Sequence, residues 1–303
     1  MTDISHESVE IFTEFPHPYR SIEELIEFLD TELERPFMDP DSRLARNFSL
    51  DGKVVVDAGC GCGTKSIQMA NLGTKLTIGV DGSQSGINTA GALARHFEFE
   101  NTKFILGFLE DLEELLANEG LEHVDYVHNI GNIHHVSDWK QVLGIFYRVL
   151  APGGFTYISW VEPSIRFGSF NIKNKIAYAL GSTPEQRAKI GGFLFGWWDQ
   201  RHNMKQAGAD GFYADLYAAF YKIITVGQFR REAERLGFEF VEGDPPLDIG
   251  TWVDVRPPGG KRDFVARAID VLPFLKPLFT LALRLRQFVG YGSLRSVVLR
   301  KPE

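Results

Sequence analysis

From Lys53 to about residue 163, short hydrophobic runs alternate with longer segments in which apolar residues recur every three or four positions. The short runs are typical of buried strands and the longer segments of amphipathic helices. Five such repeats in about 110 residues predict an α/β fold in which a parallel sheet carries helices on both faces. The predicted strands are KVVVDAG, KLTIGVD, TKFILG, HVDYVHNIG and FTYISWVEP, and the predicted helices between them are TKSIQMANLG, SQSGINTAGALARHFE, LEDLEELLANEG and DWKQVLGIFYRVLAPGG.

The chain before this core predicts a helical extension over residues 1–50. In SIEELIEFLDTEL, Ser21 and Glu24 have the spacing of a capping box, and Ile22, Leu25 and Leu29 recur at helical intervals. We therefore expect an amphipathic helix that precedes the core at 51–163 and belongs to an amino-terminal lid.

The pattern changes after Pro163. Residues 164–224 are rich in aromatic residues and have no convincing strand, which predicts a helical insertion that forms a lid. Residues 225–303 complete the core sheet: TVGQFRREAERLG predicts a helix, and FEFVEG and SLRSVVLRK predict the last two strands. Between those strands lies a second helical insertion, at about 244–292.

Composition limits the kind of protein. The 303 residues are 44% hydrophobic and 24% charged, which suits a folded domain with a full core. The formal net charge of −8 argues against a general nucleic-acid binder, which needs clustered Lys and Arg. We expect no metal site, because Cys60 and Cys62 stand one residue apart inside a glycine cluster without a second ligand pair.

Targeting signals are not evident in the sequence. The acidic start MTDISHESVEIFTEF has neither the basic nor the apolar region of a signal peptide, and VLPFLKPLFTLAL, the longest apolar run, is broken by two prolines and Lys276. The two cysteines are suited to a reduced state. Together with the lack of a signal peptide and of a spanning apolar run, they predict a cytoplasmic protein.

The stretch VVVDAGCGCGTKSI places glycine at positions 59, 61 and 63, directly after a β-branched run and Asp57. A strand, a glycine turn and a helix bring backbone N–H groups and a helix amino terminus around a small ligand. A second strand ends at Asp81, 18 residues after Gly63. An acidic side chain there accepts hydrogen bonds from a ribose diol, so we expect a ligand with an unphosphorylated ribose.

These segments together resemble the motifs of class I S-adenosylmethionine-dependent methyltransferases of the small-molecule type. VVVDAGCGCG resembles the first motif, GVDGS the second, FILGFLEDL the third, VDYVHNIGNIHHVSD the fourth and RVLAPGGFTYIS the segment leading into the fifth strand. The resemblance covers residues 53–160 and, loosely, 225–242. It implies a Rossmann-like sheet of seven mostly parallel strands and S-adenosyl-L-methionine as the cofactor.

The resemblance also implies roles for individual residues. The glycines approach the methionine portion with Asp57 near its amino group, Asp81 holds the ribose, and Asn129 and Ile130 lie next to the sulfonium. Phe108 stands where the family often has aspartate, so either Glu110 or Asp111 approaches the adenine amino group. The full set of expected cofactor residues is Tyr19, Asp57, Gly59, Cys60, Gly61, Gly63, Asp81, Gly82, Ser83, Leu109, Glu110, Asp111, Asn129 and Ile130.

Catalysis of methyl transfer to a hydroxyl or a protonated amine needs a base, and histidine suits that role near neutral pH. NIHHVSD places His134 and His135 just after the fourth strand, at the expected mouth of the site. We favour His135 slightly as the base; the alternative is that these imidazoles cap a helix or pack beneath the cofactor. Glu162 is a further candidate: it either orients a histidine or binds the acceptor, or it is a solvated carboxylate at the end of a strand. Tyr19 either closes over the cofactor's carboxylate or belongs to a simple surface turn.

The acceptor is expected to be a mid-sized, largely apolar natural product or lipid-like metabolite, methylated on a hydroxyl, nitrogen or carbon, because the 164–224 insertion is rich in Phe, Trp and Tyr. Residues 256–303 carry ten Lys or Arg against three Asp or Glu, which indicates either a peripheral contact with anionic lipid or an ordinary lid helix. A homodimer is compatible with the sequence. The competing hypotheses are RNA or protein methylation, and cofactor binding without methyl transfer in a cyclase or a regulatory subunit.

Overall fold

The structure is a computed structural model that describes residues 21–34, 48–161, 224–244, 260–289 and 294–303, together with Val9, Thr13 and six positions between 176 and 190. Most of the predicted insertion at 164–224 therefore lies outside the described residues, as do Tyr19 and Glu162. The proposed domain boundaries stay a prediction.

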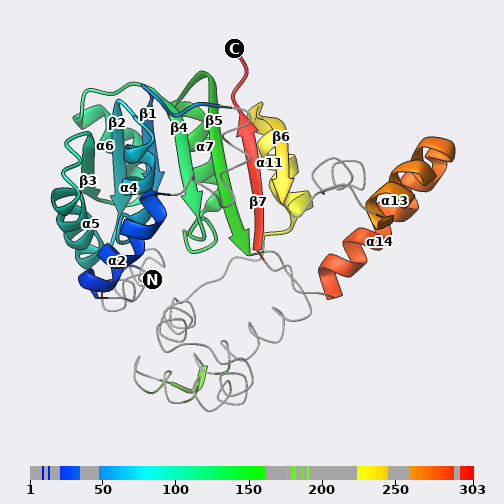
Figure 1. The fold of residues 1–303 in the computed structure, drawn as a ribbon, viewed down its shortest axis with the longest axis horizontal. Helices are drawn as coiled ribbons and strands as arrows, with labels where there is room; N and C mark the ends of the chain where they lie inside the picture. Colours follow the sequence, from blue (N-terminus) through cyan, green and yellow to red (C-terminus); the bar gives the residue numbers. More distant parts are fainter. Residues whose placement is uncertain are drawn as a thin grey trace.

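A seven-stranded sheet forms the centre of the fold, in the order β3-β2-β1-β4-β5-β7-β6 (Figure 1). The first five strands pair in parallel, whereas β7 runs antiparallel to both β5 and β6. This arrangement confirms the predicted seven-stranded, mostly parallel α/β fold, including the two carboxyl-terminal strands. The strands are β1 Val54–Ala58, β2 Leu76–Asp81, β3 Thr102–Leu106, β4 Val124–Ile130, β5 Leu150–Val161, β6 Glu239–Asp244 and β7 Leu294–Arg300.

Helices cover both faces of the sheet, and the alternation of residues along β1 explains which helix packs where. Val55 points to the face that α4 covers through Met69, whereas Val56 points to the opposite face, beneath α6 and α7. The helices are α2 Ile22–Leu33, α4 Thr64–Asn71, α5 Gln84–His96, α6 Leu112–Asn118, α7 Trp139–Val149, α11 Val226–Leu236, α13 Gly260–Val271 and α14 Lys276–Val289, with short 3₁₀ turns η1 Leu109–Asp111 and η2 Pro273–Leu275.

Local signals in the sequence account for several helix ends. The predicted capping box of α2 is present: the Glu24 N–H donates to Ser21 Oγ at 3.2 Å, and the Ser21 N–H donates to Glu24 Oε2 at 3.0 Å. Thr225 and Gln228 form a second capping box at α11, and Gly237 ends that helix in the left-handed conformation.

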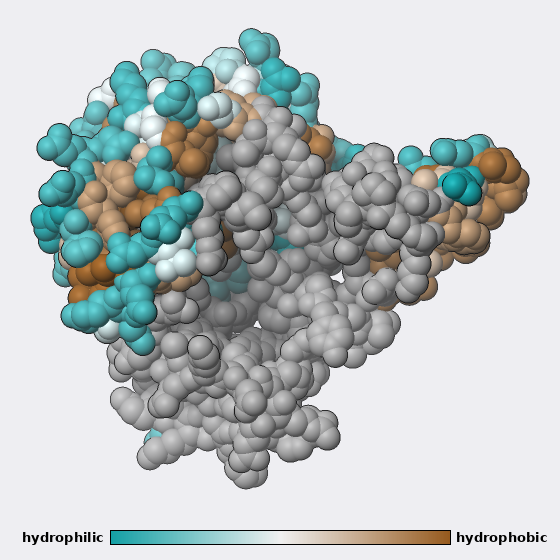
Figure 2. All heavy atoms as spheres, in the orientation of Figure 1, coloured by the Kyte–Doolittle hydropathy of each residue, from teal (hydrophilic) through white to brown (hydrophobic). Residues whose placement is uncertain are grey.

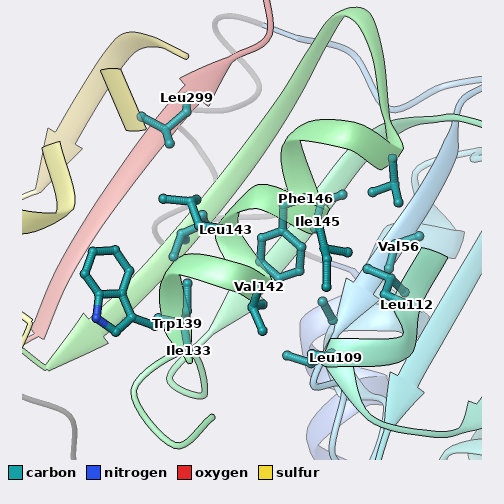
Figure 3. Close-up of a cluster of buried hydrophobic side chains, with 14 of the residues drawn as sticks. Val56, Leu109, Leu112, Ile133, Trp139, Val142, Leu143, Ile145, Phe146 and Leu299 are labelled. Carbon is teal, nitrogen blue, oxygen red and sulfur yellow. The ribbon is translucent and has the colours of Figure 1, made fainter. Parts of the chain in front are cut away.

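The largest hydrophobic core lies between the sheet and α7. Val142, Leu143 and Phe146 extend from α7 toward the sheet, and Figure 3 shows them gathered with Val56 and Leu112. This core fixes the carboxyl edge of the sheet, where the candidate site lies. Its main described side chains are Val56, Ala58, Ile78, Val80, Leu109, Leu112, Val127, Ile133, Trp139, Val142, Leu143, Phe146, Ile158, Trp160 and Phe229.

The helices α13 and α14 fall within the predicted second insertion. Figure 1 shows both projecting away from the sheet. Among the residues that the structure describes, no helix combines the length and the apolar character that crossing a membrane requires.

Candidate functional site

The glycine turn between β1 and α4 has the geometry that its composition predicts. Gly59, Gly61 and Gly63 have φ values of 80°, 52° and 77°, in the left-handed region that strongly favours glycine. The N–H groups of Gly59 and Cys60 both donate to the Val80 carbonyl, at 2.7 and 3.1 Å, so the turn is fastened to β2. The result is a bare backbone loop at the carboxyl edge of the sheet.

Close helix packing gives Gly63 a second constraint. A Cβ at this position would lie 2.5 Å from the Cβ of Ala90 on α5. The loop is therefore compressed between β1 and α5, and a side chain at position 63 has no room. Gly63 is also the N-cap of α4 and makes no side-chain cap bond. In the first turn of that helix, the Ser66 backbone N–H bonds the Asp57 carboxylate.

The Asp81 carboxylate lies at the end of β2 and connects the glycine turn to α5. One oxygen accepts the Gly61 N–H at 2.8 Å and the other accepts the Ser83 N–H at 2.8 Å. Burial raises the pKa of Asp81, while these two backbone bonds act in the opposite direction. A carboxylate has about four lone-pair sites, so each oxygen keeps capacity for one more donor, as a ribose diol would require.

A second carboxylate near the turn, that of Asp57 on β1, is held by α4. Ser66 Oγ donates to Asp57 Oδ2 at 2.6 Å, and the Asp57 side chain is almost fully buried. Burial raises its pKa to about 6, the Ser66 bond opposes that effect, and the charge of Asp81 adds to it. In this structure, Asp57 anchors the first turn of α4 to the sheet; its predicted contact with the cofactor's amino group stays a prediction.

Both cysteines of the turn are buried and free, and burial raises their pKa values, that of Cys62 to about 12. The thiols are therefore protonated at neutral pH, and Cys62 packs with Leu25 and Ile67. Within the described part of the chain, His, Cys, Asp and Glu side chains nowhere form a group of three that could hold a metal ion.

Two asparagines close the end of β4 against the glycine turn. Asn129, on β4, donates to the Ala58 carbonyl at 2.8 Å and also hydrogen bonds Asn132 Oδ1. Asn132 donates to the carbonyls of Ala58 and Gly59 at 3.1 and 3.0 Å. A Cβ at Gly59 would lie 1.7 Å from Asn132 Nδ2, so the glycine leaves the space that this amide occupies.

This arrangement bears on two predicted residues and adds one that the sequence did not indicate. The Asn129 side chain is fully buried between β1 and β4, and Ile130 packs partly against Tyr126 and Phe155. Their predicted position next to the sulfonium stays a prediction. The sequence did not indicate Asn132 because two of its side-chain partners, Ala58 and Gly59, lie more than 70 residues away in sequence. The only signal was an amide within NIGNIHH.

The two histidines follow directly. The His135 N–H donates to the Asn132 carbonyl at 2.8 Å, and the imidazoles of His134 and His135 are in contact, with ring centroids 4.3 Å apart. Both side chains are buried. Burial, and secondarily the neighbouring His135, hold the pKa of His134 well below its usual value, so that ring is neutral at physiological pH.

The corner after β3 contains three further candidates. Leu109 is buried in the main core, close to α7 in Figure 3, whereas Asp111 is exposed. Glu110 accepts a hydrogen bond from Ser137 Oγ at 3.1 Å, which links this corner to the loop after the histidines. The choice between Glu110 and Asp111 as the adenine contact therefore stays open.

Gly82 and Ser83 follow Asp81 and begin α5. Ser83 Oγ accepts the Gly86 N–H at 3.1 Å and caps the helix. A Cβ at Gly82 would lie 2.4 Å from Val9 Cγ2, and Ser85 Oγ donates to the Thr13 carbonyl at 2.7 Å. Val9 thus lies against the residue that follows β2, and Thr13 is bonded to the first turn of α5.

Four of the predicted elements meet at one edge of the sheet: the glycine turn, the carboxylate after β2, the corner after β3 and the histidine pair after β4. Bare backbone, a partly buried carboxylate and a pair of imidazoles can hold a nucleoside and receive a proton from a neighbouring group.

The comparisons with known proteins agree with this geometry. A family model described as a methyltransferase domain matches residues 49–207, which is more than half of the chain. The ubiquinone biosynthesis O-methyltransferase of Psychrobacter cryohalolentis is 29% identical over 137 residues, which cover 45% of this chain and 52% of that protein. That of Pseudomonas entomophila is 33% identical over 114 residues, covering 38% and 47%. The chain thus matches about half the length of these curated relatives.

Two solved structures show the same fold. PKMT2 from Rickettsia typhi, solved in complex with AdoHcy, has a TM-score of 0.54 and 16% identity, covering 82% of this chain and 49% of that chain. The protein BH2331 from Bacillus halodurans has a TM-score of 0.50 and 14% identity, covering 88% and 100%. With the family match and the sheet order, these findings show that the chain belongs to the methyltransferase domain family and has the fold of class I S-adenosylmethionine-dependent methyltransferases.

Proposed function

We propose that this protein transfers the methyl group of S-adenosyl-L-methionine to a hydroxyl oxygen of a mid-sized, largely apolar small molecule. The observation that carries the proposal is the partly buried Asp81 carboxylate, which accepts a backbone hydrogen bond from the glycine turn at the same edge of the sheet as two buried histidines. The choice of oxygen over nitrogen or carbon is supported by the names of the curated relatives, which are O-methyltransferases.

The described residues fit the cofactor. The left-handed glycines give the backbone freedom to approach the methionine portion. Asp81 has acceptor capacity for the ribose hydroxyls. When bound, the cofactor supplies an electrophilic methyl group on a sulfonium centre.

The chain's own contribution to the reaction is orientation and proton removal. A hydroxyl acceptor must lose its proton as its oxygen bonds to the methyl carbon, and we assign that proton to His135. Asn132 orients the turn that carries His135, through the hydrogen bond from the His135 N–H to its carbonyl. His134 packs against His135 and, being neutral, adds no positive charge that would oppose protonation of the base.

The apolar character of the acceptor rests on the aromatic composition of residues 164–224. RNA methylation, protein methylation and cofactor binding without transfer remain the competing functions. The net charge of −8 weighs against RNA, and the histidine pair weighs against a binding-only role.

The test is to incubate the purified chain with S-adenosyl-L-methionine carrying an isotopically labelled methyl group and a panel of hydroxylated, apolar small molecules. Mass spectrometry should find a labelled product with the methyl group on oxygen, and Asp81→Ala should abolish it. Label found only in RNA or protein, or an altered acceptor without label, would overturn the proposal in favour of one of its competitors.

A further inference from the structure

The helices α13 and α14, with η2 between them, form what we call the arm (residues 260–289). Figure 2 shows it projecting from the body with hydrophobic residues on its surface. Between residues 264 and 285, none is buried. Of the thirteen large hydrophobic side chains that are exposed in the described part of the chain, seven belong to the arm: Phe264, Val271, Leu272, Phe274, Leu278, Leu281 and Leu285.

The exposed apolar side chains follow helical spacing. Leu278, Leu281 and Leu285 recur at intervals of three and four residues along α14, and they are 61%, 55% and 55% exposed. Phe274 precedes Leu278 by four residues and is 72% exposed. This spacing places the three leucines along one side of α14, where they form an apolar stripe directed at solvent; Phe274 belongs to η2, which precedes the helix.

The arm differs from the rest of the chain in charge. Its sequence has six Lys or Arg and two Asp or Glu, a balance of +4, whereas the chain as a whole carries −8, which leaves −12 elsewhere. Arg267 and Lys276 are exposed on it. A basic, apolar, projecting element on an acidic body is suited to an anionic apolar surface.

We propose that the arm docks on the surface of a lipid bilayer that contains anionic lipid, with the apolar stripe at the boundary between headgroups and acyl chains. Basic side chains beside such a stripe remain at the headgroups while their methylene stems lie along the apolar layer. The inference goes beyond the proposed function and does not depend on it.

A second copy of this chain is the competing occupant. Two arms placed face to face would each bring a charge of +4, and like charges brought together disfavour that pairing. Anionic lipid neutralises the same charges, so the charge pattern favours the bilayer over the arm of another copy.

The test is cosedimentation of the full chain with sucrose-loaded vesicles, either of phosphatidylcholine alone or with phosphatidylglycerol at about one third. The chain should sediment with the anionic vesicles, and salt should weaken the binding. The triple variant L278Q/L281Q/L285Q should lower partitioning by about tenfold or more, and Lys276→Glu by about fivefold or more. Leu72→Gln and Lys75→Glu, which change exposed residues of the body, are the matched controls and should bind like the unaltered chain.

Thermal unfolding and size-exclusion chromatography of every variant accompany the vesicle measurement. Unchanged unfolding temperatures show that lost binding is not a loss of the fold. The inference is overturned if the unaltered chain stays in the supernatant with anionic vesicles, or if the arm variants bind as well as the controls. It is equally overturned if the triple variant converts a dimer to a monomer without changing vesicle binding, because the stripe is then a contact between copies.

Discussion

The carboxylate of Asp81 accepts the backbone N–H of Gly61 at 2.8 Å, a bond that joins residues 20 positions apart on neighbouring strand ends. Its other oxygen accepts the Ser83 N–H. One side chain therefore sets the conformation of the glycine turn and of the first turn of α5 while retaining acceptor capacity. The proposed cofactor site depends on this residue for its shape as well as for its chemistry.

Gly63→Ala should destabilise the protein through two separable effects. The alanine would have to adopt a φ of 77°, which costs about 1 kcal/mol, and its Cβ would meet Ala90 at 2.5 Å, which costs about 1–3 kcal/mol more. Gly120→Ala is the matched control, because Gly120 has a φ of 74° and nothing within 4 Å of its added Cβ. Urea unfolding should give a clearly larger loss for position 63; equal losses would refute the packing argument.

Asn132→Ala should lower the free energy of unfolding by about 1–3 kcal/mol, because the Ala58 and Gly59 carbonyls lose the donor that Asn132 provides. Affinity for S-adenosyl-L-homocysteine should fall with it, since the glycine turn loses its cover. Asn88→Ala, which removes an exposed amide bonded to Gln84 on α5, should change stability by less than about 0.5 kcal/mol. The assignment fails if the two variants unfold alike.

The raised pKa of Asp57 makes the free energy of unfolding depend on pH, and the sign of that dependence follows from the direction of the shift. Its pKa is raised to about 6 in the folded chain from 3.8, so below pH 4 the carboxyl is protonated in both states and burial carries no ionic cost. As pH rises toward 6, the unfolded chain releases this proton first, and the folded state loses stability, by about 2–3 kcal/mol in total. Asp57→Asn removes that cost, so its stability relative to the unaltered chain should rise between pH 4 and pH 7.

Urea unfolding at four pH values over that interval measures the difference for Asp57→Asn. Glu114→Gln, which also replaces a carboxylate by an amide but at an exposed position on α6, is the matched control. A flat profile for Asp57→Asn would show that the carboxyl is not titrating in its buried position.

His135→Asn should slow methyl transfer by about a hundredfold or more while leaving cofactor affinity unchanged, because only proton removal is lost. His134→Asn should slow turnover less, since His134 acts on the reaction through its contact with His135. Steady-state kinetics with calorimetric affinities distinguish the two residues. Full activity of His135→Asn would assign both imidazoles to packing beneath the site.

The sequence was sufficient to predict the architecture because its patterns are local. The β-branched run before Gly59 has the length and composition of a buried strand, and the spacing of Ser21 and Glu24 located the start of α2. The glycine turn was predictable for the same reason, because three glycines in five residues favour a backbone with positive φ, which glycine adopts without steric cost.

Contacts across the sheet were not predictable in the same way. The side chain of Asn132 hydrogen bonds the Gly59 carbonyl, and the two residues are 73 positions apart in sequence. The spacing of apolar residues along the chain does not predict a contact of this kind. The pattern of residues in β4 predicted that Asn129 lies near the site. It did not predict that the Asn129 amide donates a hydrogen bond to the Ala58 carbonyl. For the arm, the sequence indicated amphipathic character. That no residue of 264–285 is fully buried depends on where the chain carries those helices.

The central claim is that the glycine turn and Asp81 hold S-adenosyl-L-methionine. Isothermal titration calorimetry at pH 7 with S-adenosyl-L-homocysteine tests it directly, on the unaltered chain, Asp81→Ala and the surface control Glu114→Ala. We predict saturable binding to the unaltered chain and the control, and affinity weakened at least tenfold in Asp81→Ala, because each lost charge-assisted hydrogen bond costs about 1.5–3 kcal/mol. Absence of binding to the folded, unaltered chain, or equal affinity in all three proteins, would contradict the account.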